Sequence, residues 1–384
     1  MKSISPLIAT ILLVVIVVGL SAISYVFLTN TFGGLVQQST QQIQAISDIS
    51  VLSIVNAYFD GFYDNFEYLD TNKWTISRYS NDTNLECVVE SGTLWLVKKS
   101  VEKGCNIKLN TMSIKWNDTY VIDLRFNIDY VCGSSNDGDG MAIVIDGKDT
   151  TPLSGCNKGF NNVNQGIVIE IFDDAPNTSA NNGLGIDNDT VYCSRTADTT
   201  MISYWGNGWD KRYDLNDGII SVNLTGSRII LNYQDLNPSN GLVNTNLSTD
   251  LWNPNGLGYF MIGAGTGCSV CNSNACDQPD SAHGIDWIII SRDGFPIKLV
   301  VYNPFPKPVN LNGTYISING CVLPMLYGET FLTSTQSSII EPQEQVIVKI
   351  RPIYKTEFCE LKIGDNNICL SYEGKTNCRT IRID

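Results

Sequence analysis

Short apolar runs that alternate with polar residues extend from Tyr58 to about Asp293, and they limit the fold more than any other feature. A run such as Tyr120–Phe126 has the period of two that is typical of a strand with one buried face. Gly, Asn, Asp and Pro separate the runs, and no helical period replaces them. Many short strands joined by such turns predict a β-sandwich or barrel over residues 58–293. The fold class is therefore expected to be mainly β.

Residues 294–384 are expected to form a second, smaller β-sandwich. Three prolines, Pro304, Pro306 and Pro308, mark its entry. Alternating runs predict strands at 297–302, 314–318, 345–350, 360–363, 368–372 and 376–383. No catalytic motif occurs in this segment, so its expected role is that of a spacer or assembly module.

The N-terminal segment carries no charge between Lys2 and Asp48. Its apolar run from Ile4 to Leu28 exceeds the roughly 20 residues that span a bilayer. A secretory signal has a shorter apolar region and a small-residue cleavage site after it. The single flanking Lys2 is expected to stay cytoplasmic and to place the rest of the chain outside. Apolar residues at helical spacing then predict a helix and stalk over residues 4–57, with the stripe Ile43, Ile46, Ile49 and Leu52.

The twelve cysteines fall into two even groups, eight between Cys87 and Cys276 and four between Cys321 and Cys378. Even numbers indicate separate disulfide sets formed in an oxidising compartment. The alternative is a zinc site, which would use Cys268, Cys271 and Cys276. The chain has only one His, His283, and no second C-x-x-C pair to complete four ligands. The pairing of the first group stays open; its members are Cys87, Cys105, Cys132, Cys156, Cys193, Cys268, Cys271 and Cys276.

One disulfide in the second group follows from hairpin geometry. Cys369 and Cys378 are symmetric about Glu373-Gly374, where a two-residue turn would pair Tyr372 with Lys375. Alternation along the ladder makes the two cysteines a non-hydrogen-bonded pair, with Cα atoms about 4.5 Å apart. That separation lies within disulfide range. The pair Cys321–Cys359 then follows by elimination.

The formal net charge of -14 argues against nucleic acid as a partner, because phosphate binding needs clustered Lys and Arg. Seven N-x-S/T sequons are compatible with a glycosylated exterior. They are Asn81, Asn117, Asn177, Asn188, Asn223, Asn246 and Asn312.

The residues from Lys2 to Thr10 (KSISPLIAT) resemble the start of archaeal type IV pilins, in which a short basic leader precedes a hydrophobic helix. The resemblance implies a prepilin leader at residues 1–3, cut between Ser3 and Ile4 by a prepilin peptidase. It also implies other pilins as partners and a helix that anchors in the cell membrane before packing into a surface pilus. The leader is unusually short, and the chain is longer than a typical major pilin. A plain signal anchor is the alternative.

Several central segments resemble, in order, L-type lectins of the concanavalin A-like sandwich, a jelly roll. They are residues 59–74, Gly138–Ile145 (GDGMAIVI), Glu170–Asn177 (EIFDDAPN), Leu184–Asp187 (LGID), Tyr259–Gly267 (YFMIGAGTG) and His283–Trp287 (HGIDW). The resemblance covers about 235 residues, and it implies a non-catalytic domain that binds surface glycans.

The same resemblance assigns roles to individual residues. Asp139 would accept hydrogen bonds from sugar hydroxyls, Asn177 would bond both sugar and metal, and the backbone of Gly265 or Gly267 would donate. Calcium would be held by Asp173, Asn177 and the Ala175 carbonyl, with Asn181, Asn182 or Asp187 adding an oxygen. A stacking aromatic would come from Tyr204, Trp205 or Trp209.

Two departures from the lectin pattern leave alternatives open. Glu170 and Asp173 are three residues apart, so alternation puts them on opposite faces unless a bulge intervenes. Asp139 and Asp173 could also be ordinary turn acids, in a structural pilus or cell-envelope subunit without a sugar site. A laminarinase-type glycosidase shares this sandwich, but the acid that would partner Glu170 is missing. We therefore expect a cell-surface, pilin-like adhesin that is not an enzyme.

Overall fold

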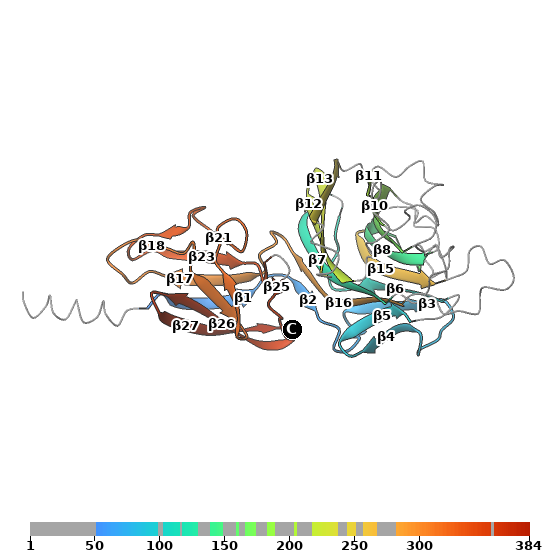
Figure 1. The fold of residues 1–384 in the computed structure, drawn as a ribbon, viewed down its shortest axis with the longest axis horizontal. Coiled ribbons are helices and arrows are strands. Elements are labelled where there is room, and N and C mark those ends of the chain that lie inside the picture. The colour runs from blue at the N-terminus through green and yellow to red at the C-terminus, as the bar shows by residue number, and fades with distance from the viewer. Residues whose placement is uncertain are drawn as a thin grey trace, which may run out of the picture.

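The computed structural model describes residues 51–98, 103–115, 117–129, 139–148, 159–160, 166–173, 183–188, 203–205, 217–236, 244–250, 256–266, 282–354 and 357–384. The expected leader, membrane helix and most of the stalk lie outside these ranges. Within them, the chain is mainly β and forms two domains side by side along the long axis (Figure 1). None of the described residues forms a helix long and apolar enough to cross a membrane.

The larger domain is built from two antiparallel sheets. Seven described strands make the first, in the spatial order β11 (Ser203–Trp205), β10 (Gly183–Asn188), β9 (Ile167–Asp173), β8 (Asp139–Gly147), β15 (Tyr259–Thr266), β6 (Lys103–Leu109) and β3 (Trp74–Arg78). The second has the order β14 (Asn244–Asp250), β13 (Arg228–Asp235), β12 (Asp217–Thr225), β7 (Thr119–Asp129), β16 (Ala282–Ser291), β5 (Thr93–Val97) and β4 (Glu86–Glu90), with β2 (Phe62–Asp64) beside β16.

The two sheets enclose one apolar core, which makes this domain a β-sandwich. Ile143 and Ile169 of the first sheet share that core with Leu124 and Ile288 of the second. Their sequence neighbours Val144 and Val168 face the other way and pack with Phe160 in a separate cluster. Strands β8 and β9 are therefore covered on both faces, which explains why their sequences are continuously apolar rather than alternating. The expected mainly β fold is confirmed.

The smaller domain also has two main sheets. One has the order β1 (Ser53–Phe59), β17 (Ile297–Tyr302), β23 (Gln345–Ile350) and β21 (Phe331–Thr333). The other has the order β20 (Cys321–Pro324), β19 (Tyr315–Ile318), β26 (Gly364–Tyr372) and β27 (Lys375–Ile383). Two short pairs complete it: β18 (Val309–Asn310) with β22 (Ile339–Ile340), and β24 (Ile353–Tyr354) with β25 (Glu357–Phe358). The expected strands at 297–302 and 345–350 are confirmed, whereas 360–363 lies between strands.

Strand β1 corrects the expected stalk, because the helix predicted through Ala57 is a strand from Ser53 onward. It pairs antiparallel with β17. Ile54 is fully buried, its N–H donates to Asn377 Oδ1 at 3.1 Å, and its carbonyl accepts from Arg379 Nε at 2.7 Å. The reason lies in tertiary contacts. The partner strand and these side chains satisfy the hydrogen-bonding groups of an extended backbone. Local helical spacing contains no information about them.

The cysteine pairs of the smaller domain are those expected from the sequence. Cys369 and Cys378 lie opposite each other in the β26–β27 hairpin, with Cα atoms 4.0 Å apart, and form a disulfide. The turn residues Glu373 and Gly374 both have positive φ, 48° and 75°, as a type I′ turn requires. Cys321 is bonded to Cys359. In the sandwich, Cys87 is bonded to Cys105, a pairing that the sequence left open.

The two domains meet in a packed junction. Trp287 and Ile289 of the sandwich belong to the apolar core of the smaller domain. The Trp287 ring stacks on Phe358 with centroids 4.1 Å apart. Tyr63 Oη donates to the Leu361 carbonyl at 2.7 Å, and burial, as the largest cause, raises the pKa of Tyr63. Apolar burial and a buried hydrogen bond together favour a fixed domain arrangement.

Candidate functional site

Two acidic residues come together at one end of the first sheet of the sandwich. β8 begins at Asp139 and β9 ends at Asp173, and because the strands are antiparallel these residues lie directly opposite each other. Opposing residues in such a ladder have Cα atoms about 4.5–5.5 Å apart. Asp139 and Asp173 are 34 positions apart in sequence (173 − 139), so only the strand register brings them together.

Beside this acidic pair, four glycines lie in one row across the sheet. Gly104 of β6 pairs with Gly265 of β15, which pairs with Gly140 of β8. The row continues through Phe172 of β9 to Gly183 of β10. We call the four glycines, Gly104, Gly265, Gly140 and Gly183, the glycine row; Phe172 interrupts it. Glycine in the middle of a sheet often marks a place where a ligand or another stretch of backbone approaches closely. Gly104, Gly140 and Gly265 are themselves buried.

A buried carboxylate fixes one end of the glycine row. Glu86 is fully buried and accepts backbone N–H bonds from Ser80 at 3.0 Å, Asp82 at 3.2 Å and Gly104 at 3.1 Å. Its neighbour Cys87 is bonded to Cys105, the residue after Gly104. Sequence reasoning missed Glu86, because a lone Glu at a strand start carries no local signal of this role.

The residue that precedes the glycine row on β6 is Lys103, which is held by its own neighbours. Its ammonium donates to Ser80 Oγ at 2.8 Å and Asp82 Oδ2 at 3.2 Å. The N–H of Asn84 and then Lys103 lower the pKa of Asp82. Next to Lys103, the buried Thr266 of β15 accepts a hydrogen bond from the Lys103 N–H at 3.2 Å.

The predicted calcium ligands are only partly placed by the structure. Asn177, Ala175, Asn181 and Asn182 lie outside the described residues, as do Gly267 and Trp209. Among the described residues, no group of three or more His, Cys, Asp or Glu is placed so that it could hold a metal ion. Strands β8 and β9 pair regularly up to Asp173, so no bulge brings Glu170 and Asp173 to one face. Of the predicted calcium ligands, Asp173 is the one that the strand register places at this end of the sheet.

Asp187 must be removed from the predicted ligand set. It pairs with Val168, whereas Gly183 pairs with Phe172 next to Asp173. Asp187 lies four residue steps along the extended strand from Gly183, which corresponds to about 13 Å. Calcium ligands lie within about 2.6 Å of the ion, so Asp187 and Asp173 are too far apart to share one. Sequence proximity to the EIFDDAPN segment was misleading because β10 runs away from that sheet end.

The remaining predicted residues lie in identifiable places. Tyr204 and Trp205 belong to β11, where Trp205 pairs with Leu184 one step inward from the glycine row. His283 is fully buried in β16, between Val97 of β5 and Ile128 of β7.

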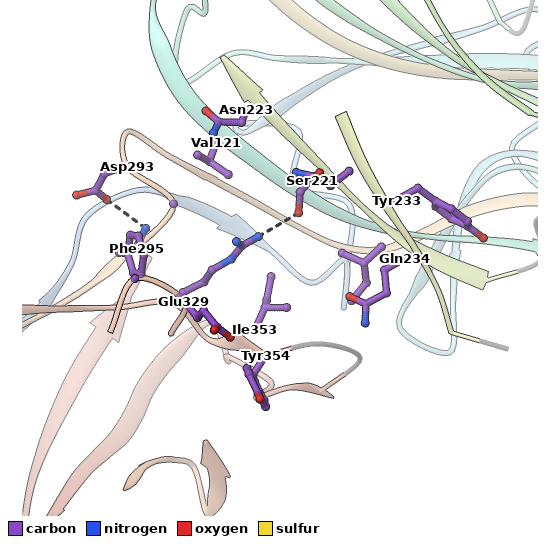
Figure 2. A pocket seen from close by; sticks show the side chains of 15 residues that line it. Val121, Ser221, Asn223, Tyr233, Gln234, Asp293, Phe295, Glu329, Ile353 and Tyr354 are labelled. Atoms are coloured by element: carbon purple, nitrogen blue, oxygen red, sulfur yellow. Dashed lines mark hydrogen bonds between the residues drawn. The ribbon is translucent and has the colours of Figure 1, made fainter. Parts of the chain in front are cut away.

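A cleft of about 560 Å³ lies between the two domains (Figure 2). Ser221, Asn223 and Gln234 line it from the sandwich, and Glu329 and Tyr354 line it from the smaller domain. Sequence reasoning could not find it, because its walls come from strands of both domains.

Arg351 and Asp293, two of the charged residues that line this cleft, are paired within the protein. Arg351 Nη2 donates to Asp123 Oδ1 at 2.6 Å and to Ser221 Oγ at 3.0 Å. Asp293 accepts from Lys298 and Lys349, each at 2.8 Å. Burial raises the pKa of Asp293, but the hydrogen bonds from the two lysines outweigh it and bring that pKa below its ordinary value. The pair of Arg351 with Asp123 therefore links the two domains beside this cleft.

Comparison with known proteins gives a likeness in shape only. No family model matches the chain, and no curated protein matches it. Among solved structures, the exoplasmic/lumenal domain of VIP36 in a Ca²⁺/Man2-bound form is 13% identical, with a TM-score of 0.43, over 63% of this chain and 89% of that one. A legume lectin-like domain from Entamoeba histolytica is 11% identical, with a TM-score of 0.39, over 63% and 98%. Peanut lectin is 11% identical, with a TM-score of 0.42, over 62% and 97%. Because identity and TM-score are low, the description of the sandwich rests on its own strands.

Proposed function

We propose that the chain is a non-catalytic glycan-binding protein of the cell surface. One observation carries the proposal: Asp139 and Asp173 lie opposite each other at a sheet end, beside the glycine row. A carboxylate there can accept two sugar hydroxyls in charge-assisted hydrogen bonds.

Calcium is the proposed cofactor of this site. Two neighbouring carboxylates repel each other, and a hard cation with further oxygen ligands offsets that repulsion. Asp173 would supply one oxygen, and Asn177, the Ala175 carbonyl and Asn182 would supply others. Asp139 would remain free to bind the sugar, together with the Asn177 amide and the backbone of Gly267.

The N-terminal segment supports a location of this activity at the cell surface. We propose that the helix beginning at Ile4 anchors the protein in the cell membrane, with both β-domains outside the cell. A prepilin peptidase would remove residues 1–3, and other pilins would be partners in a surface pilus. The three disulfides among the described residues fit an oxidising exterior.

A glycan array read with calcium and with chelator tests the proposal. Binding should require calcium, and Asp139→Asn should weaken it at least about tenfold, because one charge-assisted hydrogen bond contributes roughly 1.5–3 kcal/mol. Asp365→Asn is the matched control: it is the same change at an exposed position in the smaller domain, and it should leave binding unchanged. Asp173→Ala should weaken binding too, with partial rescue by excess calcium.

If no glycan binds under either condition, the proposal fails, and a structural pilus or envelope subunit becomes the better description. Electron microscopy of surface filaments, with and without the chain, would then test that role. Release of reducing sugar from a bound glycan would instead reveal a glycosidase.

A further inference from the structure

A second cleft, of about 420 Å³, opens between the two domains and is separate from the sheet-end site. Tyr63, Asn65 and Trp287 line it from the sandwich, and Phe358 and Glu360 line it from the smaller domain. The stacking of Trp287 on Phe358 and the hydrogen bond from Tyr63 to the smaller domain hold these walls in place. The cleft is therefore preformed, and its volume lies within the range of small-molecule sites, about 300–1,000 Å³.

Two deeply buried polar atoms on residues of this cleft have no hydrogen-bond partner in the protein. They are Trp287 Nε1, on a residue only 4% exposed, and Asn65 Oδ1, on a residue 8% exposed. The other end of the Asn65 amide is satisfied, because Nδ2 donates to Glu67 Oε1 at 3.1 Å. Buried polar atoms nearly always have a partner, so these two call for one from outside the chain. Trp287 Nε1 can only donate and Asn65 Oδ1 can only accept.

The charges around the cleft narrow the choice of ligand. Glu67, Glu360 and Asp286 line it, and of these Asp286 is paired with Arg125 Nε at 3.1 Å. The excess of carboxylates disfavours an anion. An ammonium or guanidinium group would suit the carboxylates, but it has donors only and would leave the Trp287 N–H unpaired. A hydroxyl or acetamido group both donates and accepts, which matches both orphaned atoms.

We propose that this interdomain cleft is a second ligand site, and that it takes a neutral saccharide bearing hydroxyl or acetamido groups. Phe358, which is half-buried and lines the cleft, supplies an apolar surface for the carbon–hydrogen face of a sugar ring. The rim carboxylates of Glu67 and Glu360 accept further hydroxyls. Both domains contribute to the site, so it exists only in the assembled chain.

Indole resonances of ¹⁵N-labelled full-length protein test this directly. The Trp287 Nε1–H signal is assigned from its loss in Trp287→Phe, which keeps an aromatic ring beside Phe358. Methyl β-N-acetylglucosaminide and methyl α-glucoside are titrated as probes. At least one should shift the Trp287 signal saturably, and Asn65→Leu should weaken that binding at least about fivefold. Should Asn65→Leu fail to fold, Glu360→Gln, a change at an exposed residue, should weaken the same binding measurably.

Several outcomes would overturn the proposal. A Trp287 signal that neither sugar moves, and that exchanges only with solvent, would mean that water satisfies the orphaned atoms. A signal that shifts with a lysine-rich peptide but with neither sugar would point to a cationic protein partner. Because the readout is Trp287 at the domain junction, its result does not depend on whether Asp139 supports glycan binding at the sheet end.

Discussion

The ion pair between Arg351 and Asp123 joins the two domains, and its removal should destabilise the protein measurably. The Asp123 side chain is 3% exposed and that of Arg351 is 28% exposed. Breaking a fully buried pair costs about 3–5 kcal/mol. Here the arginine is partly exposed, and Asp123 keeps the hydroxyl of Ser221 as a donor. We therefore expect Arg351→Met, which keeps the apolar stem, to lower the free energy of unfolding by about 2–3 kcal/mol.

A double-mutant cycle in urea separates the pair from other effects of the two substitutions. Asp123→Asn and Arg351→Met should each destabilise the protein, and the double variant should be more stable than their sum predicts by about 1–2 kcal/mol. Arg382→Met is the control, because Arg382 contacts only exposed acids and should cost less than about 0.5 kcal/mol. Additive single effects would refute the reasoning and would mean that the junction is held by apolar packing alone.

Three further predictions concern pH dependence, a disulfide and N-terminal processing. Burial raises the pKa of Asp293, but hydrogen bonds from two lysines outweigh it and lower that pKa. The resulting stabilisation is full above the ordinary Asp pKa and is lost as pH falls from there through the lowered pKa. The drop in urea midpoint between about pH 5 and pH 3 should therefore be smaller in Asp293→Asn. An equal drop would contradict this. Replacing both cysteines of the Cys369–Cys378 disulfide, whose sequence separation is 9, should cost about 2.5 kcal/mol in urea unfolding, and an unchanged midpoint would argue otherwise. Intact-mass analysis of native protein should show a chain beginning at Ile4, whereas a retained Met1 would speak against prepilin processing.

Local pattern predicted the strands well, because alternation and continuous apolar runs depend on nearby residues. The β26–β27 hairpin is an example, since its register follows from the turn at Glu373 and Gly374. Strand β1 was missed because its partner, β17, begins only at Ile297. Local helical spacing contains no information about a partner so distant in sequence.

The candidate site was also predicted only in part from local sequence. Asp139 and Asp173 were found from short motifs, but the glycine row was not. Gly104 lies in a strand with no motif of its own, and only the register of β6 against β15 aligns it with Gly265. Register also excludes Asp187, which sequence order had placed close to the other acids. Sequence order identifies candidate residues, and the lateral pairing of strands decides which of them meet.

The pairing of β1 with β17 makes the sandwich an insertion within the smaller domain. The chain enters the sandwich after Phe59 and returns at Ile297, and the two connections run together, with the Asp60 N–H donating to the Pro296 carbonyl at 2.7 Å. A pulling force between the N-terminus and a ligand on the sandwich would travel along β1 alone. A strand is already almost fully extended, so it has little slack to release. The force would then pass through β1, the edge strand of its sheet in the smaller domain, without requiring that domain to unfold.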